Sequence, residues 1–91
     1  MNANRQNTIT LAAGQAEVFD FLSDGEWSLI NYGPGTLWAS WTPGVPVLVG
    51  DQRCTMFAPN VGYTETITGI GRPTSINVIA DQGAVTLCLN I

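Results

Sequence analysis

The sequence contains no histidine, and its few basic residues are Arg5, Arg53 and Arg72, so lysine is absent as well. Without histidine, the chain lacks the commonest general base and the commonest metal ligand of proteins. Without lysine, a nucleophilic Ser, Thr or Cys would need a carboxylate or a terminal amine as its base. The composition therefore argues against an enzyme, and against a small hydrolase in particular.

Charged residues of either sign are also scarce, at 11% of the 91 residues, with a net charge of −4. Proteins that bind nucleic acid generally carry several clustered cations, which this chain does not have. We therefore expect no nucleic acid partner. So little charge gives weak protection against association, so we expect some apolar surface to be covered in a homo-oligomer or by another protein.

Long apolar runs are missing too. The polar start of the chain has no signal-peptide pattern, and no stretch approaches the length of a membrane span. We expect a chain that is made in the cytosol and has no membrane partner. Cys54 and Cys88 are too far apart for a CxxC motif and too few for a disulfide scaffold. Two reduced thiols are the favoured interpretation, and a Cys54–Cys88 disulfide is the alternative, because the sequence does not give the distance between them.

Helical periodicity is absent, whereas short runs of β-branched and aromatic residues recur between turn residues. This pattern predicts an all-β fold: an antiparallel β-sandwich or jelly-roll of about eight short strands, in which residues 8–91 form one domain after a flexible N-terminal arm at 1–7. The eight predicted strands are Thr8–Ala12, Glu17–Leu22, Glu26–Asn31, Thr36–Trp41, Gln52–Phe57, Tyr63–Ile70, Ser75–Ala80 and Ala84–Ile91.

Turn residues and alternation refine this prediction. We expect hairpins at residues 23–25 and 81–83 and a turn at residues 32–35, because glycine supplies positive φ there. Alternate residues of a strand share one face. The predicted core positions are Trp27, Leu29, Leu37, Ala39, Trp41, Ile76, Val78, Ala80, Val85, Leu87, Leu89 and Ile91. Ile9 and Leu11 share one face of the first strand, and Phe19 and Phe21 share one face of the second.

Trp38 stands apart because it points away from the face of Leu37 and Ala39. Tryptophan is common both in cores and in binding hot spots, so Trp38 is compatible with two interpretations, an interface and a second core face. The segment 42–50 contains prolines, so we expect an exposed loop or irregular edge. Its apolar side chains would be stabilised by contact with another surface. The candidate interface residues are Arg5, Tyr32, Trp38, Val45, Val47 and Leu48.

Asp20, Asp24 and Glu26 lie close together in sequence, so a carboxylate pair or a calcium site is one interpretation of them. The regular oxygen-ligand spacing of calcium loops is missing, so a solvated turn is the better interpretation. Glu17 and Glu65 have no basic neighbour in sequence that would tune them for acid–base chemistry. We expect no metal site, no cofactor and no catalytic residue.

Three stretches resemble small virion proteins of tailed phages, a family that includes capsid decoration, or cement, proteins. They are TITLAAGQ, LINYGPGTLWASW and INVIADQGAVTLCLNI, at the beginning, middle and end of the chain. The resemblance implies a β-sandwich on the outer surface of a capsid, often as a trimer or dimer, that bridges subunits of the major capsid protein. It also implies that the arm at residues 1–7 contacts the shell.

The resemblance leaves other parts of a virion open. Related modules occur in tails, fibres and receptor-binding proteins, where exposed tryptophan and tyrosine residues would bind host glycans. The expected location is therefore the virion, at the capsid surface, after synthesis in the host cytoplasm.

Overall fold

The chain folds as one antiparallel β-sheet. The computed structural model describes residues 6–21 and 23–91, and in this part of the chain it has six strands and no helix. In chain order the strands are β1 (Gln6–Leu11), β2 (Ala16–Asp20), β3 (Gly25–Ser40), β4 (Thr55–Phe57), β5 (Val61–Ile67) and β6 (Ser75–Asn90). The all-β, antiparallel prediction is confirmed.

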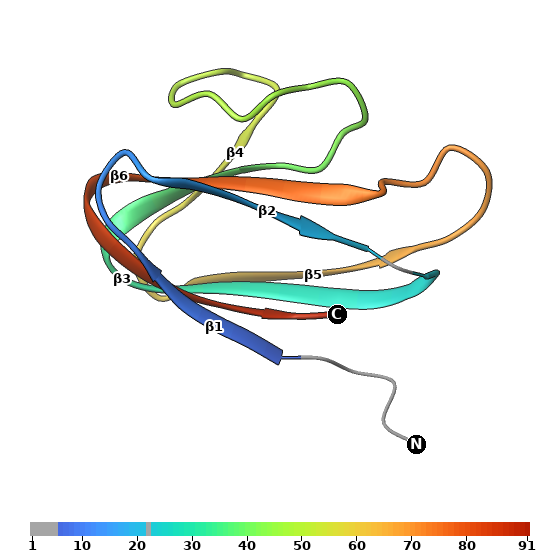
Figure 1. Ribbon diagram of the computed structural model, residues 1–91, viewed down its shortest axis with the longest axis horizontal. Coiled ribbons are helices and arrows are strands. Elements are labelled where there is room, and N and C mark those ends of the chain that lie inside the picture. The colour runs from blue at the N-terminus through green and yellow to red at the C-terminus, as the bar shows by residue number, and fades with distance from the viewer. Residues whose placement is uncertain (1–5, 22) are drawn as a thin grey trace.

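Two long strands, β3 and β6, organise the sheet. Each has 16 residues, and they pair with each other along most of their length. Figure 1 shows both strands turning over near their midpoints, so that the sheet forms two layers joined by a bend. The lower layer runs in the order β1, residues 85–90 of β6, residues 25–31 of β3, and β5. The upper layer runs in the order β2, residues 75–81 of β6, residues 36–40 of β3, and β4.

Alternating side chains of the strands fill the space between the layers. In β3 every second residue from Trp27 to Ala39 is buried. The buried apolar core comprises Leu11, Phe21, Trp27, Leu29, Leu37, Ala39, Phe57, Ile67, Ile76, Val78, Ala80, Val85, Leu87 and Leu89, with Ile9, Phe19, Trp41 and Ile91 packed against it. All the predicted core positions are thus confirmed. Each large apolar side chain removed from water contributes about 1.5–3 kcal/mol, so this core is the main source of stability.

Extra residues on both strands produce the bend. On β3, Tyr32 is the additional residue between two register pairs with β6. On β6, residues 82–84 stand opposite the single residue Gly35. Bulges of this kind bend a strand and increase its twist. The backbones approach closely at this point, because a Cβ atom built on Gly35 would lie 2.5 Å from the carbonyl oxygen of Gly83.

The side chain of Asn31 cross-links the bend from inside and is fully buried. Its Nδ2 donates hydrogen bonds to the carbonyl oxygens of Gly35 at 3.0 Å and Phe57 at 2.9 Å. Its Oδ1 accepts a hydrogen bond of 2.7 Å from the N–H of Gly33. The backbone oxygen of Asn31 accepts another, of 2.6 Å, from the N–H of Asn60. One residue therefore joins both sides of the bulge in β3 to β4 and to the turn before β5.

Aromatic rings join the layers at the end away from the bend. Trp27 belongs to the lower layer, and Trp41 directly follows the part of β3 in the upper layer. Their rings meet edge to face at 5.0 Å, and Trp41 stacks on Tyr63 of β5 at 5.4 Å. Phe21 packs on Trp27 at 5.3 Å. Such pairs contribute about 0.5–1.5 kcal/mol beyond the area they bury, so the cluster holds the layers together.

Two predicted reversals of the chain are bulges inside continuous strands. Residues 32–35 lie within β3, and residues 81–83 lie within β6. The predicted third and fourth strands are therefore one strand, and so are the predicted seventh and eighth. Glycine allows the backbone conformations of a bulge as readily as those of a chain reversal, so the same glycine pattern in the sequence is compatible with both. The prediction of eight strands is therefore wrong. Backbone hydrogen bonds between the strands join both layers into one sheet, so a sandwich or jelly-roll is not confirmed.

The predicted hairpin at residues 23–25 is also wrong. β2 pairs with β6 in the upper layer, whereas the start of β3 pairs with β5 and β6 in the lower layer. The chain crosses between layers here, and side chains of the segment before β6 hold the crossing. Arg72 Nε lies 2.8 Å from Asp24 Oδ1, and Thr68 Oγ1 donates a hydrogen bond of 3.2 Å to Asp24 Oδ2.

Replacing Asn31 by alanine is expected to lower the free energy of unfolding by about 2–5 kcal/mol, because it leaves three buried backbone groups without partners. Urea denaturation followed by tryptophan fluorescence measures this change. Asn90→Ala is the control, since the Asn90 side chain makes a single 3.4 Å contact with Ser28. Equal effects of the two substitutions would show that the bend does not depend on Asn31.

Gly35→Ala is expected to destabilise the fold by more than about 2 kcal/mol, because the new methyl group collides with backbone that has little room to move. Gly44→Ala separates this clash from backbone strain: Gly44 has a φ of +80° but open space around its Cβ position. The cost there is expected to be about 1–2 kcal/mol, because an L-residue is strained in the left-handed region. Thermal unfolding of both variants compares the two costs.

Candidate binding surface

The outer face of the upper layer carries a continuous row of apolar side chains. The register places Ala16 of β2 opposite Ile79 of β6, Ile79 opposite Trp38 of β3, and Trp38 opposite Met56 of β4. Directly opposed residues of antiparallel strands share a face. We call these four residues the apolar row. Since neighbouring strands lie about 4.8 Å apart, the row extends about 14 Å from one edge of the layer to the other.

Alternation directs Trp38 and Ile79 away from the core, because their neighbours along β3 and β6 are buried core residues, and Met56 precedes the core residue Phe57 on β4. Met56 is 53% exposed, and Val18, two residues beyond Ala16 on β2, is 55% exposed. Trp38 and Ile79 are half-buried. The Nε1 of Trp38 is covered and has no hydrogen-bond partner within the described residues. The indole therefore contributes to this face as apolar surface.

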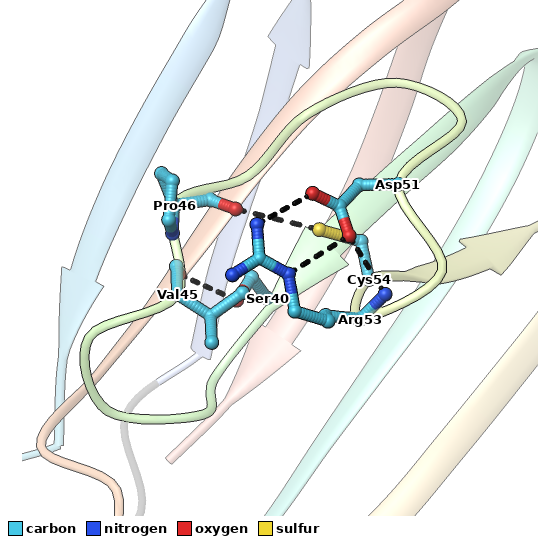
Figure 2. A network of polar contacts seen from close by, with 6 residues as sticks. All are labelled: Ser40, Val45, Pro46, Asp51, Arg53 and Cys54. Carbon is cyan, nitrogen blue, oxygen red and sulfur yellow. Dashed lines mark hydrogen bonds and ion pairs between the residues drawn. The ribbon is translucent and has the colours of Figure 1, made fainter.

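The loop between β3 and β4, residues 41–54, rises above the upper layer on the side away from the lower layer (Figure 1). Figure 2 shows how its two ends are tied to its middle. Ser40 Oγ donates a hydrogen bond of 2.7 Å to the carbonyl oxygen of Val45. Cys54 Sγ donates one of 3.4 Å to the carbonyl oxygen of Pro46. These two contacts give the 41–54 loop a defined shape.

An ion pair organises the second half of the 41–54 loop (Figure 2). The backbone N–H and the Nε of Arg53 donate to Asp51 Oδ1 at 2.8 and 3.1 Å, and Nη2 donates to Oδ2 at 2.8 Å. These hydrogen bonds lower the pKa of Asp51 to about 2 and raise the pKa of Arg53. The two charges neutralise each other, so the exposed Leu48 and Val49 lie in a loop with little net charge.

The predicted interface residues occupy separate parts of the molecule. Trp38 lies in the apolar row, and the 41–54 loop on the same side carries half-buried Val45 and Val47 and exposed Leu48. Tyr32 is exposed but lies at the bend. Arg5 falls outside the described residues together with the rest of residues 1–5, and β1 begins at Gln6, inside the predicted arm.

Sequence reasoning missed Met56, Ile79 and Val18. Each alternates with a residue that faces the core, so each could have been assigned to an outer face. Their alignment with Trp38 could not have been found, because it depends on the pairing of β2 with β6 and of β6 with β3, between segments distant in the sequence.

The part of the chain at residues 6–21 and 23–91 has no group of three or more His, Cys, Asp or Glu residues placed to hold a metal ion. It also has no helix with the length and apolar character needed to cross a membrane. Cys54 and Cys88 are not joined in a disulfide: Cys54 is half-buried in the 41–54 loop, and Cys88 is buried in β6.

Comparisons with protein-family models, with curated proteins and with solved structures gave no match to this chain. Its own residues are therefore the guide to its function. Among these, the apolar row joins residues of all four strands of the upper layer on the face opposite the core.

The pKa of Asp51 provides a test of the loop structure. We expect its carboxyl group to titrate near pH 2, and Arg53→Gln to return the midpoint toward 3.8, the ordinary value. Because the pKa is lowered by folding, the stabilising effect of the pair is present above pH 4 and is lost as the pH falls toward 2. NMR titration of the carboxyl carbon measures both midpoints. A wild-type midpoint near 4 would contradict the ion pair.

Proposed function

We propose that this chain is a decoration, or cement, protein of a tailed-phage capsid. It binds the outer surface of the assembled shell and bridges subunits of the major capsid protein, and it is not an enzyme. The supporting observation is the apolar row, which crosses a whole layer of a chain with little charge, with Met56 exposed and Trp38 and Ile79 half-buried. Contiguous apolar surface on a small protein is typical of an interaction site. The proposed location is the virion, at the capsid surface, after synthesis in the host cytoplasm.

Because a capsid shell repeats the same subunit many times, each bound copy of this protein needs to contribute only a modest binding energy. Each Å² of apolar area removed from water contributes about 25 cal/mol. A copy that touches two neighbouring coat subunits makes its second contact at a high effective concentration, so the two contacts reinforce each other. The anchored 41–54 loop supports this function, because a surface that is already ordered loses less entropy on binding.

A structural module of a tail, fibre or receptor-binding protein is the second candidate, since the same apolar row would serve there. Glycan recognition is less favoured on physical grounds. A sugar ring stacks on the face of an aromatic side chain, but Trp41 and Tyr63 stack on one another, and Trp38 is half-buried. The indole Nε1 of Trp38 is also covered.

Binding to the shell tests the proposal directly. Purified protein should co-sediment with shells assembled from the major capsid protein of the same genome and should not bind the unassembled coat subunit. Failure to bind any shell would refute the proposal. Co-purification with isolated tails or fibres and not with shells would support the second candidate.

Met56→Ser, alone and with Val18→Ser, tests the surface. We expect at least about tenfold weaker shell binding for Met56→Ser and about 100-fold for the pair, because each change removes apolar area from the contact. Ile70→Ser is the matched control: Ile70 is fully exposed at 108%, but it lies in the segment between β5 and β6 and outside the apolar row. Equal losses for Met56→Ser and Ile70→Ser would contradict the assignment.

A further inference from the structure

We infer that the apolar row docks on a partner surface that is apolar at its centre and basic at its margin, and that a second copy of this chain is not the occupant. The inference rests on the proposed function and adds the charge of the coat surface to it. Two carboxylates on the outer face of the upper layer support it.

Asp20 and Asp81 bracket the apolar row along the strands. Asp81 follows Ile79 by two residues on β6, so it lies on the same face, about 7 Å toward the bend. Asp20 follows Val18 by two residues on β2. Because β2 runs antiparallel to β6, Asp20 lies on the opposite side of the row. The apolar row therefore has one carboxylate on each of its two sides, Asp81 toward the bend and Asp20 opposite Ser75, away from the bend.

The described residues supply no cation to neutralise these carboxylates. Arg53 pairs with Asp51, and Arg72 pairs with Asp24, each at 2.8 Å. No ion pair of Asp20 or Asp81 is present in residues 6–21 and 23–91. A partner that covers the row must therefore either leave two carboxylates facing its surface or supply their counter-charges.

A second copy of the chain is a poor occupant for this reason. In a two-fold symmetric contact the same patch faces itself, so the Asp20 and Asp81 carboxylates of one copy approach those of the other. Like charges brought together at an interface cost affinity. A homo-oligomer of this chain, such as the expected trimer or dimer, would accordingly form through another surface and leave the apolar row free for the coat.

A basic margin on the partner has a kinetic signature. Opposite charges at the rim of an interface accelerate encounter more than they slow dissociation, and salt screens this effect over about 10 Å at 0.1 M. Association of the wild-type protein with shells should therefore slow as salt rises from 20 to about 300 mM. The dissociation rate should change less.

Charge removal in matched positions tests the inference with shells immobilised for kinetic measurement. In 20 mM salt, Asp20→Asn combined with Asp81→Asn should slow association about 3- to 10-fold and flatten its salt dependence. Asp81→Asn alone is compared with Glu26→Gln, which removes one charge from the lower layer, where Glu26 is exposed on β3. Glu26→Gln should have less than about half the effect of Asp81→Asn.

The possible outcomes separate this inference from the proposed function. Shell binding that depends on Met56 but not on Asp20 and Asp81 would overturn the basic margin and leave the decoration function standing. Faster association of the charge-removed variants would overturn it as well. Sedimentation equilibrium that shows a dimer weakened by Met56→Ser would identify a second copy as the occupant. The absence of any shell binding would overturn both proposals.

Discussion

The buried side chain of Asn31 is the contact on which the arrangement of the sheet depends. Where β3 departs from regular pairing, the Asn31 amide makes three hydrogen bonds to backbone groups of Gly33, Gly35 and Phe57. A bulge deep in a core would otherwise leave polar backbone groups without partners, which is costly in an apolar interior. Asn31 thus allows two 16-residue strands to bend within one hydrogen-bonded sheet.

The bend also creates the candidate binding surface. Because each long strand passes through both layers, the core occupies the space between them, and the outer face of the upper layer lies on the side where the 41–54 loop rises (Figure 1). In the upper layer that face is crossed by apolar residues from every strand. The 41–54 loop extends this surface and is held by hydrogen bonds at its base. The core and the candidate binding surface therefore lie on opposite faces of the same strands.

The positions that face the core were predictable because they follow from alternation along a strand, which is a local property. Trp27, Leu29 and Val78 are examples, and Trp38 was placed correctly on the opposite face. The connections were not predictable. The glycines near residues 33 and 83 permit either a reversal or a bulge, and the choice depends on pairing between β3 and β6, which lie far apart in the chain.

The sequence by itself determined an all-β chain whose core positions alternate along the strands. Only the tertiary structure decided that eight apparent strands are six, and that Ala16, Ile79, Trp38 and Met56 form a row. The physical reason is the range of the interactions involved. Alternation and turn propensity act between neighbours in sequence, whereas strand register, the bend at Asn31 and the placement of Asp20 and Asp81 around the row arise from long-range pairing of the backbone.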